Sequence, residues 1–141
     1  MDIKIVTNEE ELQQAYQVRK IVFVDEQKVP VEEEIDHLEE ESTHFLVMIE
    51  NDEPIGAGRF RIVDNYGKVE RICVLPQARS TGVGRSLMEA IEQHALSQGL
   101  EITKLNAQVQ AIPFYKSLGY GIISEEFLDA GIPHRTMKKR L

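Results

Sequence analysis

The 141-residue chain contains a single cysteine, Cys73, which excludes an internal disulfide. With no histidine or second cysteine at ligand spacing around it, Cys73 offers no zinc framework either, so we expect no metal site. Long hydrophobic runs are also lacking, because the apolar run from Phe45 to Ile49 is far shorter than the roughly 20 residues that cross a bilayer. The first residues lack the basic and apolar regions of a signal peptide. We therefore expect a soluble, cytoplasmic protein without membrane contact.

Positive charge is scarce. The chain carries 16 Lys and Arg against 24 Asp and Glu, a formal net charge of −8, whereas recognition of a phosphate backbone depends on clustered basic side chains. A nucleic-acid partner is therefore not expected. Residues 1–53 hold 4 basic and 16 acidic groups, and residues 54–141 hold 12 basic and 8 acidic groups. An anionic ligand is accordingly expected in the second part of the chain.

The overall composition is typical of a globular protein, with 42% hydrophobic and 28% charged residues. A second independent core would leave each part near the size at which proteins need disulfides or metals for stability. We therefore expect one domain, residues 1–141. No pattern in the sequence argues for or against a homodimer.

The residue pattern predicts strands and helices in alternation. A strand over residues 2–7 precedes a helix that begins at Asn8 and continues at helical spacing to Phe23. The acidic stretch from Gln27 to Ser42 contains Pro30, so we expect a loop with a short helix there. Three antiparallel strands follow, over residues 44–49, 55–63 and 68–75.

Beyond these strands the hydrophobic period changes. Val83, Leu87, Ile91 and Ala95 recur at every fourth position, which predicts a helix capped by Ser80 or Thr81 and ended before Gly99. The remaining elements expected are a strand over residues 102–107, a short helix over 111–117, and two closing strands over 120–124 and 134–138.

A glycine-containing loop, Arg-Ser-Thr-Gly-Val-Gly-Arg over residues 79–85, connects a strand to the first turn of that helix. Glycine at positions 82 and 84 leaves the unpaired N–H groups of the helix start open to a ligand, which suits a pyrophosphate. The loop is not a Walker loop because Arg85, not lysine, follows Gly84. It is not the dinucleotide fingerprint because Leu87 occupies the last glycine position. The alternative is a plain loop-to-helix transition with glycines for tight packing.

Two motifs at a defined separation carry a family resemblance. Arg79-x-x-Gly82-x-Gly84 follows a Val-Glu-Arg-Ile-Cys-Val strand and precedes Asn106-Ala107 and Phe-Tyr-Lys-Ser-Leu-Gly-Tyr at residues 114–120. The combination resembles the GNAT superfamily of acetyl-CoA-dependent N-acetyltransferases, clearly so from His44 to Gly121. Segments at residues 23–30, 34–36 and 131–134 further resemble its ElaA-like bacterial branch.

The resemblance implies an α/β (α+β) fold, with a mixed, mostly antiparallel sheet flanked by helices and splayed between its fourth and fifth strands. Acetyl-CoA, the implied acyl donor, would lie in that opening without any metal. Backbone groups of Ile72, Cys73 and Val74 would pair with the pantetheine arm, and Asn106 would contact it. The pyrophosphate would be held by the amides of the loop, with charge-assisted contacts from its two arginines: Arg79, Ser80, Thr81, Gly82, Val83, Gly84 and Arg85.

Acetyl transfer from a thioester to an amine requires a base, because an ammonium of pKa near 10.4 is no nucleophile, and an acid for the departing thiolate. Tyr115 matches the family's general acid; the alternative is a core tyrosine with a satisfied hydroxyl. Glu70 matches a strand glutamate that serves some members as base. Its expected place on one face with Ile72 and Val74 would desolvate it and raise its pKa. The alternative for Glu70 is a salt bridge with Arg59 or Arg61.

His134 is a further candidate base, against a purely structural role at the start of a strand. The acidic stretch from Glu32 to Glu41 falls where the family places its acceptor-side loops. It would either steer a cationic amine or form an ordinary solvated face. The expected partner is a small-molecule or peptide amine.

The sequence thus predicts an enzyme, an acetyl-CoA-dependent N-acetyltransferase that moves the acetyl group directly to a primary amine. One alternative is a non-catalytic acyl-CoA-binding or regulatory module, in which Glu70 and Tyr115 are merely structural. Another is an interaction protein whose acidic stretch docks a basic partner, but this leaves the loop from Arg79 to Gly84 without a purpose.

Overall fold

The computed structural model describes all 141 residues, Met1–Leu141. One eight-stranded sheet forms its centre, with the order β1-β2-β3-β4-β5-β8-β6 and with β7 paired to β8 outside this path. The strands are β1 Asp2–Ile5, β2 Thr43–Ile49, β3 Glu53–Val63, β4 Tyr66–Val74, β5 Ile102–Gln108, β6 Gly121–Ile122, β7 Phe127–Asp129 and β8 Ile132–Arg140.

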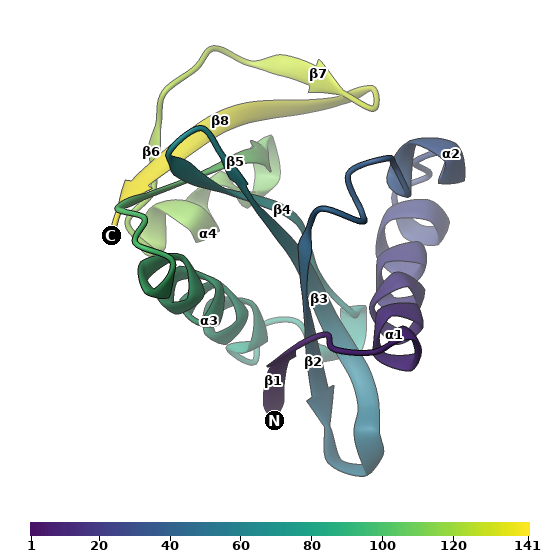
Figure 1. Ribbon diagram of the computed structural model, residues 1–141. Coiled ribbons are helices and arrows are strands. Elements are labelled where there is room, and N and C mark those ends of the chain that lie inside the picture. Colours follow the sequence, from purple (N-terminus) through teal and green to yellow (C-terminus); the bar gives the residue numbers. More distant parts are fainter.

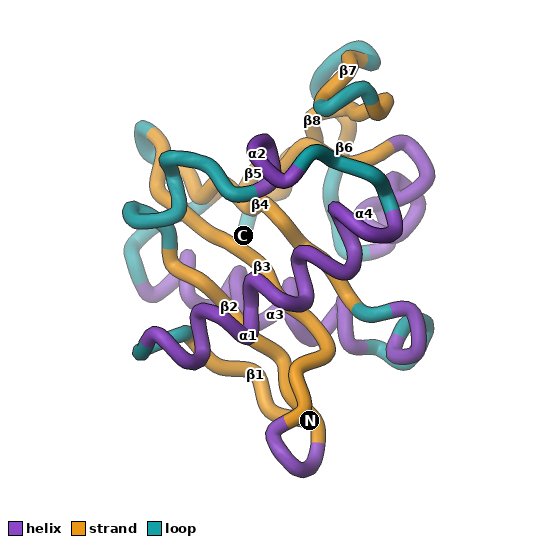
Figure 2. The backbone as a smooth tube through the Cα atoms, turned by 90° about the vertical axis from the view of Figure 1, so that its right-hand side faces the viewer, coloured by secondary structure: helices purple, strands orange, loops and turns teal.

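Helices cover both faces of this sheet. The α-helices are α1 Glu9–Arg19, α2 Val31–Glu34, α3 Val83–Ser97 and α4 Ile112–Ser117; a π-helix spans Lys20–Glu26, and short 3-10 turns span Glu50–Asp52, Pro76–Ala78 and Val109–Ala111. Figure 1 shows α1 and α3 on opposite sides of the central strands, and Figure 2 shows α1 crossing in front of them with α3 behind. No helix is long and apolar enough to span a membrane.

The first helix begins as predicted and ends differently. The Asn8 side chain caps α1 by accepting a hydrogen bond from the N–H of Glu11, which satisfies one of the unpaired donors of the first turn. After Arg19 the chain continues as a π-helix to Glu26, so the predicted single helix through Phe23 is two segments. A π-helix is rare and often found at functional sites, and this one ends at the cavity described below.

The helix α3 carries the predicted apolar stripe, and Val83, Leu87 and Ile91 are buried against the sheet. The prediction of a Ser80 or Thr81 cap was wrong. Gly82 is the N-cap residue, in a left-handed conformation with φ of 89° and no side-chain cap, while the Thr81 hydroxyl donates to the carbonyl of Ala78.

The sheet is divided where β4 meets β5. Strands β2, β3 and β4 are antiparallel neighbours, as predicted. Strands β4 and β5 run parallel, and they pair only from Gly67 to Val69 against Thr103 to Leu105. Beyond these residues the two strands diverge, which confirms the predicted splay between the fourth and fifth strands.

The closing part of the sheet holds one strand more than predicted. The strand expected over residues 120–124 is only Gly121–Ile122, whereas β8 is longer than expected. Between them β7 forms a hairpin with β8, turned at Ala130 and Gly131, which both have positive φ. In Figure 2 this hairpin projects from the edge of the molecule.

A continuous core of 26 buried residues lies between the sheet and its helices. His94 of α3 packs edge-on against the rings of Phe45 and Phe60, at centroid distances of 5.7 and 5.2 Å. His94 therefore packs α3 against the sheet.

Candidate active site

A cavity of about 960 Å³ occupies the space that opens where β4 and β5 diverge. Its walls come from β4, β5, α4, the end of the π-helix, α2 and the β7–β8 hairpin. All three candidate catalytic residues line it, namely Glu70, Tyr115 and His134, and so do five of the predicted coenzyme contacts: Ile72, Cys73, Val74, Arg79 and Asn106. The fold therefore gathers residues that lie up to 64 positions apart in the sequence, from Glu70 to His134.

A β-bulge interrupts β4 at the cavity wall. Arg71 has a left-handed φ of 58°, and the register against β3 shifts there, so two residues of β4 lie opposite Gly58 alone. A Cβ atom on Gly58 would lie 2.7 Å from Cδ1 of Ile72, beside side chains of α3. Ile72 therefore faces α3.

Glu70 faces the opposite side of the sheet, toward α1. Its Oε1 lies 2.8 Å from Nε of Arg61 and 3.3 Å from Nη2 of Arg59. The expectation that Glu70 shares one face with Ile72 was wrong, because the extra residue in the bulge reverses the alternation of side chains. The ion pairs considered as the alternative for Glu70 are both present.

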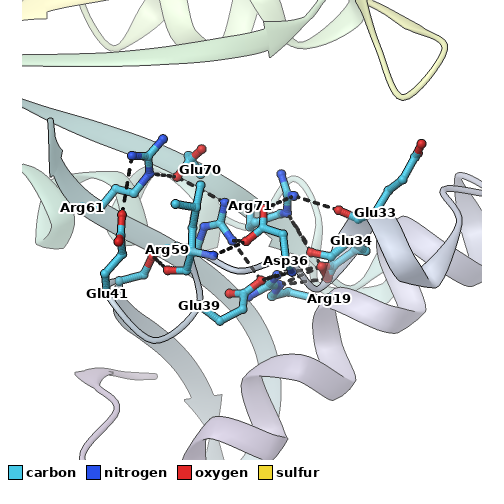
Figure 3. A network of polar contacts seen from close by, with 12 residues as sticks. Arg19, Glu33, Glu34, Asp36, Glu39, Glu41, Arg59, Arg61, Glu70 and Arg71 are labelled. Carbon is cyan, nitrogen blue, oxygen red and sulfur yellow. Dashed lines mark hydrogen bonds and ion pairs between the residues drawn. The ribbon is translucent and has the colours of Figure 1, made fainter.

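Three arginines bind the acidic stretch to the body of the protein (Figure 3). Arg19 of α1 donates to both carboxylate oxygens of Glu34 and of Glu39, and Arg59 of β3 donates to Asp36 and Glu39. Arg71 donates to Asp36 and to backbone carbonyls of residues 33 and 34. This part of the acidic stretch is thus a buried polar network beneath the cavity and not a solvated face.

The charged groups of this network stabilise one another in their ionised forms. Burial alone would raise the pKa of Glu39, but hydrogen bonds from Arg19 and the charges of Arg19 and Arg59 outweigh burial and hold the pKa at about 2. Burial likewise opposes the charged form of Arg19, yet its two carboxylate partners raise its pKa. The pairs stay ionised at neutral pH and fix the segment from Glu34 to Glu39 against β3 and β4.

The Tyr115 side chain is almost fully enclosed, with 8% of its surface exposed, and its hydroxyl has no hydrogen-bond partner in the protein. Only two side-chain polar atoms are both fully buried and without a hydrogen-bond partner, Nδ1 of His44 and Nε of Arg59. The unpaired Tyr115 hydroxyl is not one of them, so it still reaches open space in the cavity that Tyr115 lines. Burial raises the pKa of Tyr115, which keeps the phenol protonated and able to donate.

His134 presents one free nitrogen to the same cavity. Its Nδ1 lies 2.6 Å from the carbonyl oxygen of Ile132, and its side chain is also only 8% exposed. Because a carbonyl accepts and never donates, Nδ1 carries the proton of the neutral ring, and the lone pair is left on Nε2. No group of the protein bonds to Nε2, so the imidazole is placed as a proton acceptor.

Cys73 lies buried in the cavity wall, and its thiol donates weakly to the carbonyl of Ala57 at 3.7 Å. Burial raises the pKa of this thiol to about 12. The thiolate, which is the nucleophilic form, is therefore negligible at neutral pH.

The glycine loop presents a run of free backbone donors. The N–H groups of residues 80–85 make no hydrogen bond within the protein; the first helical bond runs from Ser86 to the carbonyl of Gly82. A Cβ on Gly82 would meet nothing within 4 Å, so the loop is open on that side. An exposed helix N-terminus with unpaired amides favours an anion. Of the seven loop residues, only Arg79 lines the cavity itself.

Two side-chain bridges cross the mouth of the gap, and the sequence did not reveal them. Arg79 forms two hydrogen bonds with Glu26, at 2.7 and 2.8 Å, and a third with the carbonyl of Val74. The Gln108 amide donates to Gln27 at 2.7 Å. These hydrogen bonds hold the end of the π-helix against both diverging strands. Glu26 and Gln27 lie within residues 23–30, which resemble the ElaA-like branch, but the spacing of residues in the sequence does not indicate their partners.

The comparisons with known proteins agree with this geometry. Residues 7–141 match the family described as "Acetyltransferase (GNAT) domain", and the chain belongs to that family. It is accordingly an acyltransferase. No group of three or more His, Cys, Asp or Glu side chains is placed to hold a metal ion.

Relatives extend over the full length of the chain. It is 56% identical over 140 residues to the uncharacterised N-acetyltransferase YjcF of Bacillus subtilis (strain 168), covering 99% of each protein. Among solved structures, Escherichia coli ElaA matches with a TM-score of 0.86 at 25% identity over 99% of each chain. An acyl-CoA N-acyltransferase of Pseudomonas aeruginosa matches with a TM-score of 0.87 at 26% identity, also over 99% of each chain. The resemblance to the GNAT superfamily and the expected fold are thus confirmed.

Proposed function

We propose that the chain acts as a single domain that uses acetyl-CoA to acetylate a primary amine directly, the acceptor being a small molecule or a peptide. One observation carries the proposal. The unpartnered amides of residues 80–85 adjoin a cavity between two diverging strands, and the free hydroxyl of Tyr115 opens into that cavity. Such an arrangement suits a ligand with an anionic head and a long, thin arm.

The residues fit a coenzyme A thioester along this path. The free amides of the loop and the exposed Arg85 suit the diphosphate. Strand β4 has no neighbour on its β5 side after Val69, so the backbone from Ile72 to Val74 is available to an extended amide chain, apart from the Val74 carbonyl, which accepts from Arg79. Asn106 accepts from the Thr136 hydroxyl at 2.8 Å, which leaves its amide N–H₂ free toward the cavity.

A structural neighbour supports the same donor. An aminoglycoside 6'-N-acetyltransferase crystallised with coenzyme A has this fold, with a TM-score of 0.80 at 15% identity. Three hydrogen bonds to Glu26 and Val74 fix the Arg79 guanidinium at the start of the loop. From this position Arg79 is expected to contribute positive charge to the diphosphate site.

Acetyl-CoA supplies the activated acetyl thioester, and the chain supplies the two proton transfers. Nε2 of His134 takes a proton from the incoming ammonium, which frees the amine as nucleophile. The Tyr115 hydroxyl donates a proton to the departing sulfur. Since the Cys73 thiol is buried and protonated, transfer is direct, without an acetylated enzyme.

Glu70 has a different place in this proposal. Its carboxylate is shared between Arg59 and Arg61, which makes it part of the wall that supports the acceptor-side loop. Two arginines hold Glu70 through its Oε1, whereas Nε2 of His134 has no partner in the protein. For this reason the proposal gives the role of base to His134.

The test measures thiol release from acetyl-CoA with a panel of small amines, aminoglycosides, polyamines and peptide amines, with mass spectrometry of each product. The proposal predicts an N-acetylated amine from at least one acceptor and no acetyl group on the protein. Coenzyme A binding without turnover on any amine would favour the non-catalytic acyl-CoA-binding module. An acetylated enzyme that accumulates would contradict direct transfer.

A further inference from the structure

The carboxylates that line the cavity fall into two groups. Four of them are paired with arginines: Glu26, Glu34, Asp36 and Glu70. The other three make no ion pair and no side-chain hydrogen bond, and all three residues are exposed at the mouth of the cavity: Glu32 and Glu33 of α2 and Asp129 of β7. We refer to these three as the acceptor rim.

The rim lies on both sides of the cavity mouth. In Figure 1 the tip of the β7–β8 hairpin lies above α2, and residues of both elements line the cavity. Figure 3 shows the Glu33 side chain directed away from the arginine network, whereas its neighbour Glu34 points into that network. The arginines beneath the cavity therefore do not neutralise the rim.

Only one basic side chain in the cavity is without a partner. Arg71 and Arg79 are bound to carboxylates, whereas Lys68 makes no ion pair. Burial lowers the pKa of Lys68, whereas the charges of Glu70 and Asp129 favour its cationic form, so the Lys68 cation partly offsets the charge of Asp129. Three unpaired negative charges against one positive charge leave the acceptor half of the cavity negative.

Two enclosed polar atoms point to a ligand in the same cavity, independently of the rim. The Tyr115 hydroxyl and Nε2 of His134 belong to side chains more than nine-tenths buried, and neither has a partner in the protein. Buried polar groups are normally hydrogen-bonded, so orphans that open into a cavity indicate a polar ligand there.

We propose that the acceptor is a linear diamine or polyamine that binds with one amine at His134 and a second, charged ammonium at the acceptor rim. This rests on the function proposed above. The reacting ammonium gives one proton to Nε2 of His134, and the free amine forms the bond to the acetyl carbon. The carbon–sulfur bond breaks, the sulfur takes the proton of Tyr115, and the acylated nitrogen gives its second proton to the Tyr115 phenolate, which restores the acid. The second ammonium keeps its charge throughout and is held by Glu33, Glu32 and Asp129.

The test compares three acceptors with the same four-carbon chain: putrescine, butylamine and γ-aminobutyrate. Thiol release from acetyl-CoA gives kcat/KM for each, and calorimetry with the coenzyme-loaded protein gives its affinity. We expect putrescine to be preferred over butylamine and γ-aminobutyrate to be the poorest acceptor. An equal rate for putrescine and butylamine, or a preference for γ-aminobutyrate, would overturn the proposal.

Variants decide whether the rim causes the preference. Glu33→Gln and Asp129→Asn should each lower kcat/KM for putrescine by about threefold, and the double variant by about tenfold, with butylamine unaffected. Glu10→Gln is the matched control, since Glu10 is also an exposed, unpaired glutamate in the first turn of a helix. A preference for putrescine that survives the double variant would contradict the proposal.

Lys68→Gln separates the diamine from a zwitterionic acceptor. Removal of this cation should improve putrescine as a substrate, because the ammonium no longer meets a like charge. The same change would weaken an acceptor whose carboxylate binds Lys68, and that result would refute the diamine.

A failure of the diamine proposal can be distinguished from a failure of the proposed acetyltransferase function. If calorimetry without any amine detects no binding of coenzyme A to the parent protein, the acetyltransferase site itself is refuted. If coenzyme A binds and no amine turns over, calorimetry with putrescine still decides: binding that the double variant loses supports the rim, and absence of binding overturns it.

Discussion

Replacement of Tyr115 by phenylalanine separates catalysis from stability unusually cleanly. The Tyr115 hydroxyl has no hydrogen-bond partner in the protein, so its removal leaves no buried donor or acceptor unpaired. We expect the free energy of unfolding to change by less than about 0.5 kcal/mol. In its proposed role as general acid, however, the hydroxyl is expected to contribute about 10²- to 10⁴-fold to the rate. A loss of this size is about 3 to 5 kcal/mol in the activation barrier.

The matched control is Tyr120→Phe. Tyr120 is a buried tyrosine whose ring lies 5.9 Å from that of Tyr115, and its hydroxyl donates to Glu92 at 2.9 Å and bonds Thr103 at 2.8 Å. Its removal leaves these partners unsatisfied and should destabilise the protein by about 1 to 3 kcal/mol. The hydroxyl does not face the cavity, so kcat should be retained.

The assay records kcat by thiol release, coenzyme A affinity by calorimetry and stability by chemical denaturation for both variants. Tyr115→Phe should lower kcat with unchanged affinity and stability, and Tyr120→Phe should do the reverse. A Tyr115→Phe enzyme with the parent kcat would remove Tyr115 from the mechanism. Equal losses of kcat in the two variants would mean that the Tyr115 hydroxyl has no specific role in the reaction.

Three further predictions concern the base and the polar network. His134→Gln should lower kcat by at least about a hundredfold and Glu70→Gln should change it far less; the opposite result, from initial rates of thiol release, would assign the base to Glu70. Glu39→Gln should lower the free energy of unfolding by about 3 kcal/mol in denaturant titrations, because it leaves Arg19 and Arg59 partly unpaired in a buried site, and a loss below about 0.5 kcal/mol would contradict this. The folded-state pKa of Glu39 is depressed to about 2, so the stability it contributes is present above its ordinary pKa near 4.5 and declines as pH falls toward 2; a parent protein equally stable at pH 6 and 3 would refute this coupling.

Regular, periodic elements were predictable from the sequence. The four-residue repeat of α3 and the alternating strands β2 to β4 reflect burial of one face, so side-chain pattern and backbone structure agree. The gap between β4 and β5 came from the family resemblance, since pairing that stops at Val69 leaves no local signal.

The errors have a common physical origin. The bulge in β4 places Arg71 in a left-handed conformation, which is not a preference of arginine and so has no signature in the sequence. The bulge reversed the expected orientation of Glu70 relative to Ile72. Likewise, the bridge from Glu26 to Arg79 joins residues 53 positions apart. Such pairs depend on the tertiary fold and not on local spacing.

The most direct test of the account is the affinity of coenzyme A for a Gly82→Leu variant. Gly82 and Gly99 lie at opposite ends of α3, both with left-handed φ and with open space around the missing Cβ. Leucine at either position should therefore cost a similar strain of about 1 to 2 kcal/mol. Only the side chain at 82 would stand before the free amides of residues 80–85.

Calorimetry with coenzyme A and with pantetheine, which lacks the diphosphate, distinguishes local obstruction from general destabilisation. We predict that Gly82→Leu weakens coenzyme A binding by at least about tenfold and leaves pantetheine binding unchanged, whereas Gly99→Leu alters neither. Coenzyme A affinity equal to that of the parent protein in Gly82→Leu would contradict a diphosphate site at the start of α3.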